Sequence, residues 1–262
     1  MYIHWRDAWG EEAVQHFCQA LLTPPPLCLA IMGNRETWLE QALQQGFEAV
    51  AGELSAYAVL LPTGTDVTSL PGFQEGAFSV MDQAAQTPIM ALSIPQSGTI
   101  LDICAAPGGK TSLLSQRFPT AKIFAIERQG KRIPRLQENL SRLKKANTHI
   151  IQGDALKLPF PDASVDAIIL DAPCSASGIL RRHPDAKFLH SENDVMALAQ
   201  QQKQMLDEAM RTLKPKGALI YAVCSIHPKE NASVLAGYPV LQQQRIFPSE
   251  THDGFFWAYL SK

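Results

Sequence analysis

From Gly98 onward the chain alternates short apolar runs with helical patterns, and this alternation constrains its fold more than any other feature. The runs are almost continuously apolar, which is typical of strands covered on both faces of a parallel sheet. Repeated strand–helix–strand order predicts βαβ units in an α/β domain. The five expected parallel strands span residues 98–103, 122–127, 148–152, 165–171 and 217–224.

Helical patterns separate these runs. We expect helices over 108–118 and 131–145, and a long one over 191–213 that starts at a capping-box pattern, Ser191 with Asp194. The ending RIFPSETHDGFFWAYL predicts two further strands that pair as a hairpin. The expected sheet therefore has seven strands and is mostly parallel.

The first 97 residues have a different, loop-rich character with two helical stretches, at 9–22 and 36–45. Pro88 and Pro95 predict a seam before the sheet domain. We therefore expect a small α+β domain followed by a larger one, over residues 1–90 and 91–262.

The net charge, the cysteine spacing and the length of the apolar runs exclude several classes of partner. The net charge is −2 and the pI near 6.4, so no global basic field indicates nucleic acid. The five cysteines lack metal-ligand spacing, the apolar runs are too short to cross a bilayer, and the N-terminal stretch is charged. We expect a cytoplasmic protein with reduced thiols, no metal and no membrane partner.

The loop between the first strand and its helix predicts a cofactor cradle, because small residues let a ligand approach the backbone and the helix start offers free N–H groups. It is neither the G-x-G-x-x-G dinucleotide fingerprint nor a P-loop. The loop consists of Cys104, Ala105, Ala106, Pro107, Gly108, Gly109 and Lys110.

Three carboxylates are expected at the same edge of the sheet: Glu127, Asp154 and Asp171. Any one of them alone is better explained as a strand-end residue satisfied by nearby N–H groups. Three together favour a ligand with ribose hydroxyls, an adenine amino group and a cationic centre. S-adenosylmethionine has all three features.

Two apolar runs are each followed by a thiol, Cys174 and Cys224. Carbon 5 of a pyrimidine becomes nucleophilic only after a thiolate adds to carbon 6, and a second group can assist the release of the product. The alternative is that the cysteines are buried small hydrophobes, which we accept for Cys18 and Cys28. Cys104 is expected to line the cofactor loop through its backbone.

Three segments, LDICAAPGGKT, DAPCSASGILRRHPD and YAVCSIHPKEN, resemble the hallmark motifs of the Sun/Fmu (RsmB)/Nop2 family of RNA cytosine-5 methyltransferases. The resemblance extends over about residues 1 to 262, and the block DVTSLPGFQEGAFSVMDQAAQ is most similar to the bacterial branch acting on 16S rRNA. It implies a Rossmann-like class I S-adenosylmethionine-dependent methyltransferase fold, with an RNA-facing N-terminal domain.

The resemblance also implies roles for individual residues. Cys224 would attack the cytosine, and Cys174 would assist product release. Asp171 and Lys110 would lie near the cytosine, while the cofactor contacts would fall on residues 104–110, Glu127, Asp154 and Asp171.

The chain departs from the family pattern in several places. The bacterial relatives usually carry an additional N-terminal helical RNA-binding domain, and this chain starts after the point where that domain would end. Ala30, Ile31 and Met32 replace a block that is basic and amide-bearing in the relatives, and Val223 replaces a common threonine. These departures concern RNA affinity rather than the thiols, and a separate RNA-binding partner would compensate for them.

Basic residues at two places are expected to bind RNA: Arg132 after the second strand, and Arg181 with Arg182 after Cys174. A solvated helix face is an equal alternative for the first place. The leading interpretation is methylation of carbon 5 of an RNA cytosine through a covalent cysteine–C6 adduct. The alternatives are a non-catalytic S-adenosylmethionine-binding RNA-binding or assembly factor, and a methyltransferase acting on tRNA.

Overall fold

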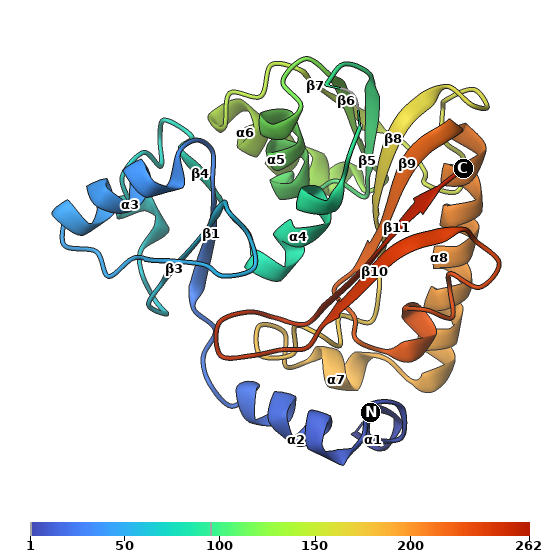
Figure 1. The fold of residues 1–262 in the computed structure, drawn as a ribbon, viewed down its shortest axis with the longest axis horizontal. Helices are drawn as coiled ribbons and strands as arrows, with labels where there is room; N and C mark the ends of the chain where they lie inside the picture. Colours follow the sequence, from blue (N-terminus) through green and yellow to red (C-terminus); the bar gives the residue numbers. More distant parts are fainter. Residues whose placement is uncertain (1, 95) are drawn as a thin grey trace.

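The computed structural model describes residues 2–94 and 96–262 (Figure 1). A seven-stranded sheet has the order β10-β11-β9-β8-β5-β6-β7, and its neighbours from β9 to β7 all run parallel. The last two strands, β10 and β11, add an antiparallel hairpin. This confirms the predicted seven-stranded, mostly parallel sheet. Its strands are β5 (Thr99–Ile103), β6 (Lys122–Glu127), β7 (Thr148–Gln152), β8 (Val165–Asp171), β9 (Leu213–Val223), β10 (Val240–Ile246) and β11 (Phe255–Ser261).

Helices cover both faces of this sheet, as the continuously apolar strands require. Leu101 of β5 belongs to the core beneath α8, whereas its neighbour Ile100 belongs to the core beneath α4 and α5. Ser191 caps α8 through the predicted capping box with Asp194. The covering helices are α4 (Gln83–Ala91), α5 (Gly109–Arg117), α6 (Ile133–Arg142) and α8 (Glu192–Thr212); α7 (Ala186–Leu189) is a short turn before α8.

The N-terminal part contains two units, the helix pair α1–α2 and a small antiparallel sheet. An antiparallel sheet of order β2-β3-β1-β4 packs with α3 around Trp38 and Phe78. The predicted helix over 9–22 corresponds to α2, and a further helix, α1, precedes it; Gly10, with a φ of 82°, separates the two. The elements are α1 (Tyr2–Trp9), α2 (Glu11–Ala20), β1 (Leu27–Ile31), α3 (Arg35–Gln44), β2 (Val50–Ala51), β3 (Ala58–Leu61) and β4 (Phe78–Val80).

The connection between the two sheets is a helix. Figure 1 shows α4 between them, and α4 contacts β1 and β3 on one side and β11 and α5 on the other. Pro88 lies inside α4 and does not mark a break, while Pro95 lies outside the described residues. The expected boundary after residue 90 thus falls near the end of a helix that both parts share. No described helix is long and apolar enough to cross a membrane.

The loop after β8 crosses the end of β9 at very close range. Gly178 donates its N–H to the carbonyl of Cys224 (3.0 Å) and accepts from the N–H of Gly254 (2.8 Å). A Cβ atom at Gly178 would lie 2.4 Å from the carbonyl oxygen of Gly254. Only glycine therefore lets these three backbone segments meet.

Replacing Gly178 by Ala is expected to lower the free energy of unfolding by about 2 kcal/mol, because backbone rather than a flexible side chain must move. Urea denaturation followed by circular dichroism measures this change. Gly33→Ala is the control, since no atom lies within 4 Å of a Cβ there. Equal stability of the two variants would contradict the close packing.

Candidate active site

The predicted cofactor loop curls over the carboxyl end of β5. Gly108 begins α5 with a φ of 102°, and a Cβ there would lie 2.8 Å from Leu136 of α6. The Asn139 amide donates to the carbonyl of Pro107 (2.9 Å), and Arg132 donates to that of Ala106. The loop is therefore fixed by α6 and its preceding turn, while its other side faces the cavities.

Glu127 is a buried carboxylate at the end of β6, next to this loop. Its Oε1 accepts from the N–H of Gln129 (2.8 Å). Its Oε2 lies 3.2 Å from Arg132 Nη1 but has no hydrogen-bond partner among the described residues. A buried acceptor without a partner is costly, so this oxygen fits a ribose hydroxyl of the expected cofactor.

Two adjoining cavities meet at Cys104, Arg132 and Pro173. The smaller, of about 110 Å³, is bordered by Glu127 and Asp154. Asp154 is half exposed and lies 4.0 Å from Arg128. The larger, of about 300 Å³, is bordered by all four predicted catalytic residues: Lys110, Asp171, Cys174 and Cys224.

The two thiols face each other in the larger cavity. Because β8 and β9 are adjacent and parallel, with Asp171 opposite Ala222, the residues that follow them emerge at the same edge. The sulfurs of Cys174 and Cys224 lie 3.4 Å apart. The structure thus brings together the two cysteines that the sequence singled out, although fifty positions separate them.

The groups around the two thiols shift the pKa of Cys174 and of the neighbouring Lys110. The hydrogen bond to Cys224 raises the pKa of Cys174 well above its ordinary value, and burial adds to the shift. Burial lowers the pKa of Lys110, but the Asp171 carboxylate 2.8 Å away outweighs it, so the net shift is upward and the ammonium persists. Cys174 therefore holds its proton firmly, and a cation borders the cavity that both thiols share.

The other three cysteines are poor nucleophiles. Burial raises the pKa of Cys104 to about 12, with Asp171 and Glu127 contributing. Burial also raises the pKa of Cys28 and of Cys18. The interpretation of Cys18 and Cys28 as packing residues agrees with these positions.

The arginines expected to bind RNA are partly engaged inside the protein. Arg181 is 1% exposed and donates to Asp253 (2.7 Å). Arg182 also binds Asp253 and lies 3.3 Å from Asp82, but 31% of its side chain remains exposed. Arg132 is 43% exposed at the cofactor loop. Arg182 and Arg132 can therefore reach a ligand, whereas Arg181 is fixed as an internal ion pair.

The sequence did not single out several residues that lie in or near the thiol cavity. Asp82, Asp253 and Phe255 border the thiol cavity, and the Lys110 ammonium lies 5.3 Å from the centre of the Phe255 ring. Asp102 is fully buried in β5, and burial raises its pKa to about 7. An acidic residue inside an apolar run was the only signal for Asp102.

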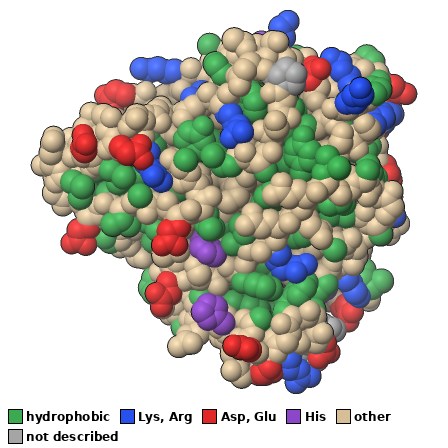
Figure 2. Space-filling view, viewed as in Figure 1, with side chains coloured by type: hydrophobic (Ala, Val, Ile, Leu, Met, Phe, Trp, Pro, Cys, Tyr) green, Lys and Arg blue, Asp and Glu red, His purple; other side chains and the backbone are tan. Residues whose placement is uncertain are grey.

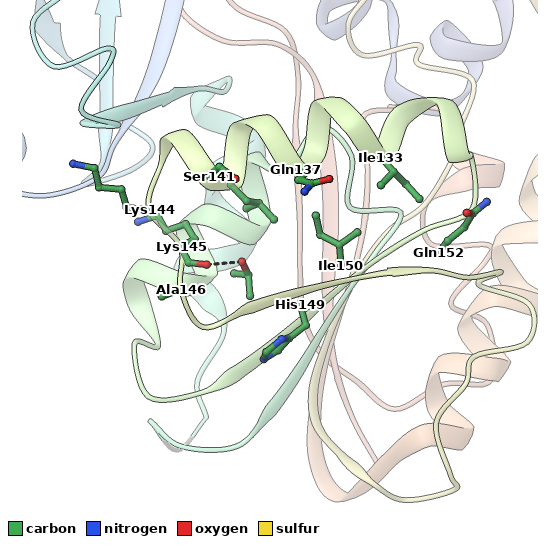
Figure 3. Close-up of a pocket in the computed structure, with 11 residues that line it drawn as sticks. Ile133, Gln137, Ser141, Lys144, Lys145, Ala146, His149, Ile150 and Gln152 are labelled. Atoms are coloured by element: carbon green, nitrogen blue, oxygen red, sulfur yellow. Dashed lines mark hydrogen bonds between the residues drawn. The ribbon is translucent and has the colours of Figure 1, made fainter.

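A larger hollow lies elsewhere, between α6 and the edge strand β7, and measures about 950 Å³ (Figure 3). None of the predicted catalytic or cofactor residues borders it. Its labelled side chains form an open groove that contains Lys144, Lys145 and His149 but no carboxylate. We therefore choose the thiol cavity as the candidate site because of the residues that border it, and not because of its volume.

Comparisons with known proteins identify the family of the chain. The family model "16S rRNA methyltransferase RsmB/F" matches residues 89–244. A Vibrio cholerae protein named ribosomal RNA small subunit methyltransferase B is 40% identical over 96% of the chain and 62% of its own length. A Shewanella oneidensis protein of the same name is 39% identical over 91% of the chain and 60% of its length. The chain thus spans about three fifths of these relatives.

Solved structures share the fold. A methyltransferase homolog from Pyrococcus horikoshii superposes with a TM-score of 0.84 at 25% identity, covering 97% of this chain and 92% of its own. A second Pyrococcus horikoshii structure, described as NSun6 with SFG, has a TM-score of 0.88 at 18% identity over 100% and 97%. With these matches, the chain belongs to the 16S rRNA methyltransferase RsmB/F family.

Proposed function

We propose that the protein methylates carbon 5 of a cytosine in RNA, with 16S rRNA as the substrate and S-adenosylmethionine as the methyl donor. One observation carries the proposal: two thiols 3.4 Å apart share a cavity with the Lys110–Asp171 ion pair, directly beside the cofactor loop. The names of the RsmB/F relatives support ribosomal RNA as the substrate.

In the proposed mechanism the Cys224 thiolate adds to carbon 6 of the cytosine, and the electron pair displaced makes carbon 5 nucleophilic. Lys110 stabilises the thiolate, while Asp171 and Lys110 lie where they can bind the base. S-adenosylmethionine supplies the methyl group that carbon 5 receives. Water then takes the proton from carbon 5, the carbon 5–carbon 6 double bond re-forms and the sulfur–carbon 6 bond breaks to return the Cys224 thiolate, a step that Cys174 assists.

The cofactor would occupy the smaller cavity and its border with the larger one. Glu127 would bind the ribose through Oε2, which accepts no hydrogen bond from the described residues, and residues 104–110 would approach the cofactor through their backbone. Asp154 and Asp171 would offer further carboxylates. No step of the proposed mechanism requires a metal.

Residues 1–90 would face the RNA, and residues 91–262 would carry the chemistry. Asp82 of the N-terminal part borders the thiol cavity and binds Arg182. Figure 2 shows basic side chains interspersed with acidic ones on the visible face. RNA contact would therefore depend on local groups such as Arg132 and Arg182 rather than on a broad basic surface. A target cytosine must leave its stack to reach Cys224, which favours an unpaired site.

Replacing Cys224 by Ala is expected to reduce methyl transfer below detection, because the thiol proposed to add to carbon 6 is lost. Cys174→Ala is expected to accumulate a covalent protein–RNA adduct, since release is slowed. Tritium transfer from labelled cofactor to unmethylated 16S rRNA measures the first effect, and denaturing electrophoresis the second. An adduct in the Cys224→Ala protein would mean that the roles are reversed; Cys18→Ser is the control.

Replacing Glu127 by Gln is expected to weaken binding of S-adenosylhomocysteine by about 10-fold to 100-fold, because a charged acceptor to the ribose is lost. Isothermal titration calorimetry measures the affinity. Glu192→Gln changes an exposed carboxylate at the start of α8 and should bind normally. Unchanged affinity of the Glu127→Gln protein would contradict the placement of the cofactor in this cavity. Normal cofactor binding by the wild-type protein without methylation of any RNA would favour the non-catalytic factor.

A further inference from the structure

Glu230 is a completely buried carboxylate between the two thiol-bearing loops. Its Oε1 accepts from the N–H of Ser175 (2.9 Å) and from the amide of Gln202 (3.0 Å). Its Oε2 accepts from the hydroxyls of Ser175 and Ser225 (2.6 Å for Ser225). Four donors thus converge on one carboxylate, which compensates for removing its charge from water.

The two serines bound by Glu230 directly follow the two cysteines. Ser175 continues the chain from Cys174, and Ser225 continues it from Cys224. We propose that Glu230 is a positioning residue that ties these two loops together and thereby holds the thiols at 3.4 Å. The proposal deepens the proposed function, on which it rests for the use of both thiols.

The surrounding hydrogen bonds make this tie rigid. Gln202 of α8 also donates to the carbonyl of Pro173 (2.9 Å), one residue before Cys174. The Tyr221 hydroxyl of β9 lies 2.7 Å from the carbonyl of Glu230. The Asn231 amide donates to the carbonyl of Ser225 (2.9 Å). A buried network with this many partners holds both loops in one arrangement.

A carboxylate is the group that this position requires. All four groups around its oxygens act as donors, and a glutamine side chain has only one acceptor oxygen. Its NH₂ group would face a serine hydroxyl or the Gln202 amide. The negative charge also adds to the upward shift of the Cys174 pKa, behind the hydrogen bond to Cys224 and burial. Glu230 thus opposes the ionisation of Cys174.

The test uses the thiols themselves and needs neither RNA nor cofactor. Diamide oxidises two neighbouring thiols to a disulfide and takes up the two electrons and two protons that they lose. We expect the Cys174–Cys224 disulfide to form about tenfold more slowly in Glu230→Gln, because looser loops bring the sulfurs together less often. Quenched-flow mass spectrometry of the peptides that contain the two cysteines gives the rate.

Ser225→Ala is the second variant, since it removes one of the four donors and leaves Glu230 bound to Ser175 and Gln202. It should also slow disulfide formation, by a smaller factor. Glu192→Gln is the matched control and should react at the wild-type rate. Thermal unfolding and S-adenosylhomocysteine affinity show whether each variant is folded, because residues 104–110, Glu127 and Asp154 of the cofactor site lie on other loops.

A wild-type disulfide rate in the folded variants would overturn the proposal. Failure of both variants to fold would also reject it, because Glu230 would then serve folding rather than the geometry of the thiols. If the wild-type protein methylates no RNA, the proposed function fails while the disulfide rates still report on Glu230. A rate effect together with a lower methylation kcat at unchanged KM would support both proposals.

Discussion

The parallel pairing of β8 with β9 is the constraint on which the candidate site depends. Parallel strands end at the same edge of a sheet, so the loops that carry Cys174 and Cys224 leave it side by side. The N–H of Ala172 still bonds to the carbonyl of Ala222, and Gly178 to that of Cys224, which extends the pairing beyond the strands. Sheet topology thus places the two thiol loops side by side, and local hydrogen bonds fix the distance between them.

Electrostatics then distinguishes two chemically identical side chains. Cys174 shares its proton with Cys224 and lies near the buried carboxylate of Glu230, whereas Cys224 lies near the Lys110 ammonium. Asp171 keeps that ammonium charged despite its burial. Cys174 thus lies near a negative charge and Cys224 near a positive one, which is the difference that the proposed roles of assisting group and nucleophile require.

The N-terminal part is joined to the site by packing and by ion pairs. Trp5 and Phe17 pack with Leu180 and Ile226, which follow the two cysteines, so α1 and α2 brace the thiol loops. Asp82 and Asp253 bind the arginines that we expected to contact RNA. Residues that appear as basic surface in the sequence thus serve partly to join the small sheet, the thiol loop and the last hairpin.

The sequence by itself determined the α/β class, the seven strands, the cofactor loop and the two thiols, because apolar periodicity, glycines and strand ends are local signals. It did not predict α4, which runs through Pro88, nor the short helix α1 before Gly10. It also gave no reason to connect Glu230 with both cysteines or to bury Arg181. Only the tertiary structure decided these points, because burial and hydrogen-bond partners arise from residues that are distant in the chain and meet when the sheet forms.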